Sequence, residues 1–226
     1  MPESRASDRP VDQAASSRTS RRILQATLQL YREIGHNKTT VADIARRAGM
    51  SPANVYRFFR SRRQIEEAVV AEALDDVFKA AAIAAGGRAS PAHRLEAVIR
   101  AIAERHVRRR ANDIRLHELV ADVSEARWPV ALAHGESIVG LLASLIAAGQ
   151  AEGEIGDGSA DTLARCLFVA MNAHLGAARV AAVGTTLDEM ISFCLSALCP
   201  APFIRRQACR SCPEWSQISA ALAVPS

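Results

Sequence analysis

The sequence lacks the signals that mark a β-protein, a secreted protein or a membrane protein. No turn dipeptide such as Asn-Gly separates alternating apolar runs, which argues against β-hairpins. Residues 1–19 are polar and have no apolar core, unlike a signal peptide. The longest apolar region, residues 163–183, is interrupted by Arg165, His174 and Arg179, which argues against a membrane span. We therefore expect an all-α protein that is cytoplasmic and does not associate with membranes.

Motifs of common catalytic and metal sites are also missing. The sequence has no G-x-S-x-G, H-E-x-x-H or P-loop pattern, and its six histidines show no metal-ligand spacing. Its five cysteines include a single C-x-x-C pair, at Cys209 and Cys212. Together with Cys194 and Cys199 this pair offers a four-thiol zinc site, but those two lie in a stretch that predicts an apolar helix face. The interpretation favours no enzyme, no metal and no cofactor.

Positive charge is concentrated near the N-terminus. Residues 18–63 hold eleven Lys or Arg against two acids, a net charge of +9, whereas the remainder holds 17 bases and 22 acids, a net charge of −5. Such asymmetry indicates a nucleic-acid-binding end joined to a body with a different role. The alternative is an N-terminal domain that is merely well solvated.

The basic segment contains two helical patterns on either side of Gly49. Thr40 and Asp43 form a T-x-x-D capping box, and the residues that follow are apolar at helical spacing. Gly49 ends that helix, as a residue able to adopt positive φ does. Ser51 then provides an N-cap, and Pro52 occupies the first helical position, where its missing N–H costs nothing. Two helices joined by a short turn containing glycine predict a helix-turn-helix motif.

Helical spacing continues through most of the remaining chain. We expect helices at about 19–34, 40–48, 52–59, 61–85, 91–108, 113–122, 129–151, 160–182 and 186–198. The pattern divides the chain into a disordered arm (1–17), a helix-turn-helix domain (18–64), a larger helical body (65–199) and a poorly ordered tail (200–226).

The N-terminal fifty or so residues resemble the TetR/AcrR family of bacterial transcriptional regulators. The resemblance rests on residues 22–24, 35, 39–45, 48–51, 55–56, 59 and 61, where residue type and spacing agree. It implies a three-helix DNA-binding domain followed by a helical body that binds small ligands and dimerises. Two positions depart from the family pattern: Arg62 stands where a lysine is usual, and Phe58 where a histidine often precedes Phe59.

The second helix of the motif is expected to lie in the major groove of DNA, with its N-terminal residues against the base edges. Asn54 can pair with adenine, and Arg57 with guanine or a phosphate. The basic residues nearby are candidates for phosphate contacts, which set register but not sequence preference. For Tyr56 the alternative is a half-buried ring with its hydroxyl in water. The candidate DNA contacts are Lys38, Thr40, Arg46, Arg47, Ser51, Pro52, Ala53, Asn54, Tyr56, Arg57 and Arg62.

The helical body is expected to enclose a mostly apolar pocket for a small amphipathic or hydrophobic effector. Its candidate lining residues are Phe78, His106, His117, Trp128, Phe168, Met171, Asn172 and His174. Each of them alone is more often a core or surface residue than a ligand contact. Effector binding is expected to move the helix at 61–85 and weaken DNA binding.

One such module makes too few contacts for tight operator binding, so we expect a homodimer on a near-palindromic site. The last two helices carry faces suited to the dimer interface, although these faces can instead complete the core of the protomer. The apolar face comprises Leu187, Met190, Ile191, Cys194, Leu195 and Leu198, and the small-residue face Ala170, Ala173, Ala177 and Ala181.

These patterns favour a sequence-specific transcriptional regulator that binds a double-stranded DNA operator. The resemblance favours a repressor that a small effector releases from its operator. Two alternatives stay open: a DNA-binding protein without an effector, and a helical small-molecule-binding protein or enzyme.

Overall fold

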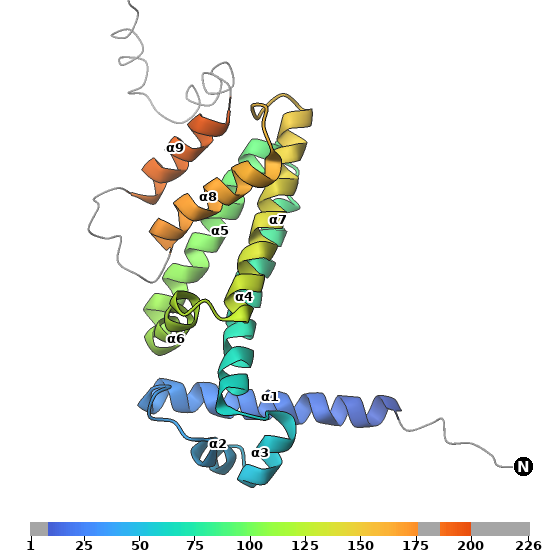
Figure 1. Cartoon of the computed structure of the whole chain (residues 1–226), viewed down its shortest axis with the longest axis vertical. Helices are drawn as coiled ribbons and strands as arrows, with labels where there is room; N and C mark the ends of the chain where they lie inside the picture. Colours follow the sequence, from blue (N-terminus) through green and yellow to red (C-terminus); the bar gives the residue numbers. More distant parts are fainter. Residues whose placement is uncertain (1–8, 176–185, 200–226) are drawn as a thin grey trace, which may run out of the picture. The chain divides into compact units, whose positions relative to one another are not determined.

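The computed structural model describes residues 9–175 and 186–199, and this part of the chain is helical without strands (Figure 1). The prediction of an all-α protein is confirmed. The helices are α1 (Arg9–Ile34), α2 (Val41–Arg47), α3 (Pro52–Phe58), α4 (Arg62–Ala85), α5 (Pro91–Asn112), α6 (Ile114–Glu125), α7 (Pro129–Ala151), α8 (Ala160–Leu175) and α9 (Leu187–Leu198).

Contacts divide the chain into two compact units. Unit 1 contains residues 1–77 and 104–134, and unit 2 contains residues 78–103 and 135–226. Helices α4, α5 and α7 each contribute residues to both units. Unit 1 therefore extends past the predicted domain boundary after residue 64 and includes all of α6.

Helix α1 begins earlier than the sequence predicted. It starts at Arg9 rather than near residue 19, so residues 9–17, expected as part of a disordered arm, continue the helix. Pro10 is compatible with this start, because a proline in the first helical turn removes no hydrogen bond. At the other end of the chain, the predicted tail and the Cys209–Cys212 pair lie outside the described residues.

A single apolar core holds unit 1 together. Its buried residues come from α1, α2, α3, α4 and α6, so the helix-turn-helix packs on α1 and α4, and α6 packs on the same cluster. Tyr31 and Ile65 are among the largest fully buried side chains of this core. The cluster comprises Ile23, Leu24, Leu30, Tyr31, Val41, Ile44, Ala45, Val55, Ile65, Val69, Val70, Leu74, Leu119, Val120 and Val123.

Helix α7 contributes several of the buried residues of unit 2. Ile138, Leu142 and Ile146 lie at 4-residue spacing on α7 and are almost fully buried. Helix α7 is also long and apolar enough to cross a membrane by length and composition, but core helices of soluble bundles share these properties. Several of its small or polar residues, Gly140 and Ser144 among them, are exposed, as expected for a helix with one core face.

Helix α9 buries much of the apolar face that the sequence offered as a dimer surface. Met190, Ile191, Cys194 and Leu198 are buried within the protomer. For these four residues the alternative interpretation, completion of the protomer core, is therefore correct. Ala177 and Ala181 of the small-residue face lie outside the described residues.

Two glycines of α7 are expected to respond oppositely to the same substitution. A Cβ at Gly149 would lie 2.6 Å from Cδ1 and 3.3 Å from Cβ of buried Ile155. Gly149→Ala should therefore lower the free energy of unfolding by about 1–3 kcal/mol through overpacking. At exposed Gly140 nothing lies within 4 Å, so Gly140→Ala should raise it by about 0.5–1 kcal/mol. Urea denaturation of both variants checks this, and equal shifts would contradict it.

Candidate nucleic-acid interface and effector site

Side-chain caps fix the start of both helices of the helix-turn-helix. The Thr40 hydroxyl accepts a hydrogen bond from the Asp43 amide at 3.2 Å, and the Asp43 carboxylate accepts one from the Thr40 amide at 3.1 Å. The Ser51 hydroxyl accepts from the Asn54 amide at 3.2 Å, with Pro52 at the first helical position. The capping patterns that the sequence predicted are confirmed.

Arg22 of α1 holds the turn between α2 and α3. Its guanidinium donates to the carbonyl oxygen of Ala48 at 2.7 Å and to that of Gly49 at 3.1 Å. Gly49 adopts a φ of +62°, and a Cβ there would lie 3.0 Å from Arg22 Nη2. A residue with a side chain would therefore be strained in φ and would crowd the arginine that orients α3.

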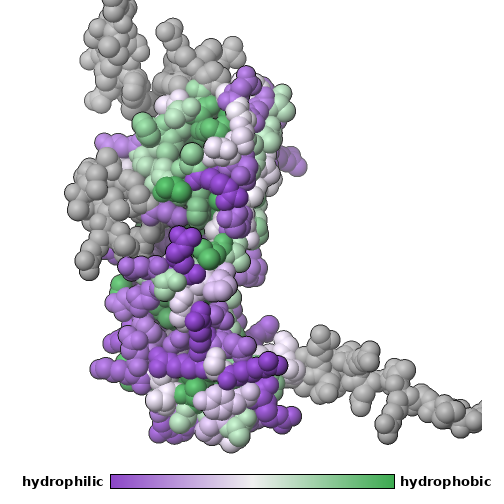
Figure 2. Space-filling model, in the orientation of Figure 1, coloured by the Kyte–Doolittle hydropathy of each residue, from purple (hydrophilic) through white to green (hydrophobic). Residues whose placement is uncertain are grey.

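Helix α3 presents an exposed face at its N-terminal end. Ser51, Pro52, Ala53, Tyr56 and Arg57 are exposed, whereas Val55 is fully buried against the core and positions the helix. Asn54 is half-buried, with its Nδ2 3.8 Å from the sulfur of Met50. The structure therefore brings most of the predicted base-contact residues onto one accessible surface. In Figure 2 hydrophilic residues predominate around α1, α2 and α3.

The predicted phosphate-contact cations differ in how they are engaged. Arg47 makes two hydrogen bonds to the Glu33 carboxylate, at 2.8 and 2.5 Å, and Arg46 pairs with Asp43. Within the part of the chain that the structure describes, Lys38 and Arg57 are exposed and make no ion pair. These two cations are therefore the ones whose charge is least compensated by the protein itself.

Arg62 faces the interior of unit 1. It donates to the His36 carbonyl oxygen at 2.6 Å and pairs with Glu66 at 3.0 Å, and it lies beside buried Tyr31. Burial, reinforced by the Glu66 charge, raises the pKa of Tyr31 well above its usual range. Arg62 thus ties the start of α4 to the turn after α1, and a phosphate contact would compete with these bonds.

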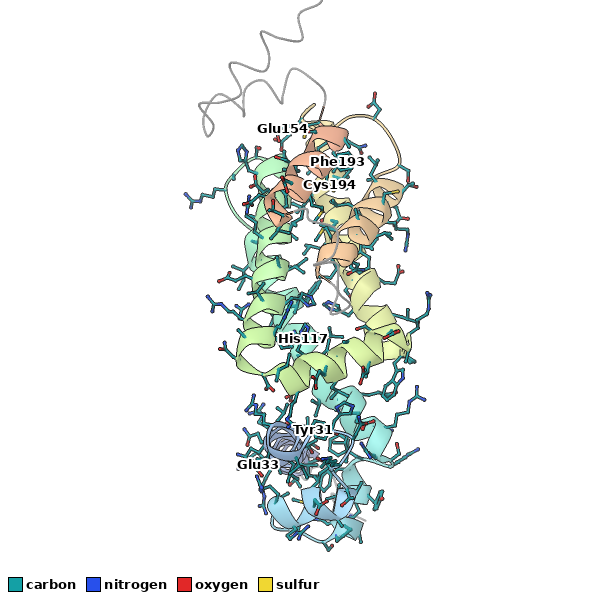
Figure 3. The ribbon with its side chains drawn as sticks, turned by 90° about the vertical axis from the view of Figure 1, so that its left-hand side faces the viewer. Tyr31, Glu33, His117, Glu154, Phe193 and Cys194 are labelled. Carbon is teal, nitrogen blue, oxygen red and sulfur yellow. The ribbon has the colours of Figure 1, made fainter. Side chains whose placement is uncertain are left out.

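The structure brings two predicted effector residues together with two that the sequence did not single out. His106 on α5 and His117 on α6, the latter labelled in Figure 3, lie close enough to Arg109 to interact electrostatically. His134 on α7 interacts with both His106 and Arg109. All four belong to unit 1. Arg109 follows His106 by three residues on one helix, a spacing that places both on the same face and could have revealed it.

Burial dominates the electrostatics of this cluster. Burial, together with a smaller contribution from the Arg109 charge, lowers the pKa of His106 and of His134 to about 4. Burial likewise lowers the pKa of His117. The three histidines are therefore neutral at neutral pH and surround one buried cation. Among the described residues, neither Arg109 Nη1 nor His117 Nδ1 has a hydrogen-bond partner, although both atoms are buried.

The remaining predicted effector residues lie elsewhere. Trp128 packs on the core of unit 1, with the Arg63 guanidinium 4.3 Å from its ring centroid. Phe78, Phe168, Met171 and Asn172 belong to unit 2, where Met171 is buried and Asn172 is exposed. The side chain of His174 lies outside the described residues.

An open pocket of about 320 Å³ lies within unit 1, between α1, α4, α5 and α6. Leu28, Val69, Ala73 and Leu116 form its apolar wall. Its charged residues are Arg32, Arg105, Arg108 and Arg109 together with Glu72, Asp76 and Asp113. Arg109 thus belongs both to the pocket and to the histidine cluster. No group of three His, Cys, Asp or Glu residues that could hold a metal ion occurs in the described part of the chain.

Two family profiles match this sequence. The profile described as "Bacterial regulatory proteins, tetR family" matches residues 23–69. The profile described as "Tetracyclin repressor-like, C-terminal domain" matches residues 91–189. Together they span most of the chain and confirm the resemblance found in the sequence. A search of curated proteins found no match.

Solved structures share the fold at low sequence identity. SmeT, the repressor of the Stenotrophomonas maltophilia multidrug efflux pump SmeDEF, is 16% identical over 83% of this chain and 94% of its own, with a TM-score of 0.59. A TetR/AcrR-family regulator from Thermobifida fusca is 23% identical over 80% and 95%, with a TM-score of 0.57. RolR in complex with resorcinol is 19% identical over 89% and 98%, with a TM-score of 0.58. At these identities the likeness establishes the fold alone.

The lowered pKa values of His106 and His134 predict that the protein becomes less stable as the pH falls. Because their folded-state pKa lies near 4, against about 6.5 when unfolded, the unfolded chain binds more protons between these values. The free energy of unfolding should therefore fall as pH drops from 6.5 toward 4, by up to about 1.4 kcal/mol per pH unit for each such histidine. His106→Gln should make the fall between pH 6.5 and 5 shallower in denaturant titrations, whereas the exposed control His93→Gln should not. Identical slopes for wild type and His106→Gln would contradict the assignment.

Proposed function

This chain belongs to the TetR family of bacterial regulatory proteins, and we propose that it is a cytoplasmic repressor released from its operator by a small effector. Family membership makes it a DNA-binding transcriptional regulator with a ligand-binding domain. The proposal adds that α3 reads a near-palindromic operator and that the helical body senses the effector.

The accessible end of α3 is the observation that carries the DNA-reading proposal. Ser51, Pro52 and Ala53 are exposed around the N-terminus of α3. The Ser51 cap, the preceding turn and the burial of Val55 in the core hold this helix in one orientation. An α-helix fits the major groove, and residues near its N-terminus reach base edges. Arg57, exposed one turn further along, is placed to contact guanine or a phosphate, and Asn54 to contact adenine.

Phosphate contacts are assigned to the exposed groups around that helix. Lys38 and Tyr56 are accessible, and Thr40 lies at the N-terminus of α2, where backbone amides and the helix dipole favour a phosphate. Arg46 and Arg47 must share their charge with Asp43 and Glu33. We therefore rank them below Lys38 in their contribution to affinity.

Contacts between α6 and α1 support an effector response. Leu119, Val120 and Val123 of α6 lie in the same buried cluster as the residues that orient α3, and Arg32 of α1 pairs with Asp113 at 2.6 Å. A ligand that displaces α6 therefore acts on the packing of the DNA-binding helices without an intermediary. SmeT, with the same fold, has been solved with triclosan, and RolR with resorcinol, which supports a small aromatic or amphipathic effector.

The dimer interface is assigned to exposed apolar residues of α8 and α9. Val169 is 69% exposed and Phe193 73% exposed, although both are apolar. On the face of unit 2 seen in Figure 2, apolar residues gather rather than being scattered among polar ones. Apolar surface of this kind is typical of an interaction site.

Removing the Arg57 side chain is expected to weaken specific DNA binding. Arg57→Ala should weaken the affinity for a duplex selected by the wild-type protein by about 1–3 kcal/mol, since a bidentate base contact is lost. Arg165→Ala removes the same charge from unit 2, where Arg165 pairs with Glu136 and Asp161, and should leave that affinity unchanged. Fluorescence anisotropy at fixed salt measures both. Equal losses in the two variants would show that charge alone binds the DNA.

Phe193→Asp is expected to dissociate the dimer. A carboxylate at an apolar interface is desolvated without a partner, which is costly. Light scattering at micromolar concentration should show a dimer for wild type and a smaller species for Phe193→Asp. Ile83→Asp on α4, where Ile83 is 78% exposed, is the control and should remain dimeric. A monomeric wild type that still binds DNA tightly would contradict the assignment.

A further inference from the structure

Arg109 is a buried cation that the described residues do not neutralise. Arg109 is 9% exposed, and within the described residues its guanidinium donates one hydrogen bond, from Nη2 to the Ala73 carbonyl oxygen at 2.7 Å. Burial lowers its pKa, an effect that Asp76 and Asp113 only partly offset. Burying a charge without a hydrogen-bonded counter-charge is costly, so native proteins rarely retain one without a use.

The two carboxylates that interact electrostatically with Arg109 form ion pairs with other arginines. Asp113 pairs with Arg32 at 2.6 Å, and Asp76 pairs with Arg105 at 3.4 Å. The pocket that Arg109 helps to line contains four arginines against three acidic residues. Arg108 pairs with Glu104 on its own helix, so among the described residues Arg109 is the arginine of this pocket that makes no ion pair.

The groups around Arg109 leave further hydrogen-bonding capacity unused. His106, His117 and His134 face it and, being neutral, supply no negative charge. His117 is 8% exposed, and its Nδ1 has no partner among the described residues, as is also true of Arg109 Nη1. Two unsatisfied buried polar atoms on neighbouring helices thus accompany one unbalanced charge. A single anionic group could accept hydrogen bonds from both atoms and balance the charge of Arg109.

We propose that Arg109 and His117 bind the carboxylate of a small effector whose apolar part lies against Val69, Ala73 and Leu116. A guanidinium binds a carboxylate through parallel hydrogen bonds, and His117 can donate a further one from the tautomer protonated at Nδ1. The pocket lined by Arg109 gives such a molecule a route and an apolar wall. The inference deepens the proposed sensor function by naming the charge class of the effector, and it depends on that function only for its effect on DNA.

Matched pairs of acids and amides test this chemistry in the full-length protein. Benzoate and phenylacetate are compared by calorimetry with benzamide and phenylacetamide, which have the same shape without the charge. The acids should bind about tenfold or more tightly than the amides, as expected for a hydrogen-bonded charge pair. Arg109→Met should remove that preference. Arg110→Met, an exposed neighbour on α5 outside the pocket, should retain it.

The stability of the unliganded variant provides a test that does not depend on the probes. If Arg109 is kept for a ligand, Arg109→Met should unfold at the same temperature as wild type or higher, because an unpaired buried charge is removed. If Arg109 is needed to hold α4 and α5 through the Ala73 carbonyl, the variant should unfold at a clearly lower temperature, and the proposal is overturned.

The outcomes separate this inference from the proposed function. Acids that bind through Arg109 but leave DNA affinity unchanged would support the anion site and contradict effector release. Amides that bind as tightly as the acids and release DNA would overturn the anion site while supporting the regulator. Absence of any preference for the acids in wild type overturns the inference.

Discussion

The apolar cluster that joins α1, α4 and α6 is the interaction on which the rest of unit 1 depends. Tyr31, Ile65 and Leu119 come from three helices and are buried in one core. The same cluster includes Val55, which anchors α3, so the helix proposed to read DNA has no core of its own. Packing is dense in such interiors, and a shift of one helix is felt by its neighbours. With the roles proposed for α6 and α3, the shared core itself connects the helix that senses the effector with the helix that reads DNA.

Arg109 shows the opposite constraint, because it adds charge and unsatisfied hydrogen-bonding atoms where packing alone would favour apolar residues. Stability and the proposed ligand recognition compete at this position. Arg62 of the same unit has structural partners instead, because it donates to the His36 carbonyl oxygen and pairs with Glu66. Arg62 and Arg109 therefore differ in their partners. A cation whose hydrogen bonds and charge are satisfied within the protein is structural, whereas one without such partners is available to a ligand.

Local patterns predicted much of the fold. The capping box at Thr40, the N-cap at Ser51 and the glycine after α2 act within a few residues, so sequence alone located these helix ends correctly. The Arg22 contact with the α2–α3 turn, the inward position of Arg62 and the cluster around Arg109 join residues more than 25 positions apart or on different helices. Helical periodicity says which face is apolar but not which helix it meets, so it could not place His134 beside Arg109. For the same reason it could not show that α9 buries Met190 and Ile191 inside the protomer.

Selection of bound sites from random duplex DNA tests the central claim most directly. If a dimer presents two copies of α3 held by the shared core of unit 1, the selected duplexes should contain an inverted repeat with half-sites about one helical turn apart, or a multiple of it. Enrichment of such a repeat by wild type, and its absence from duplexes selected by Arg57→Ala, is the predicted result. A pool without any enriched sequence would contradict the account.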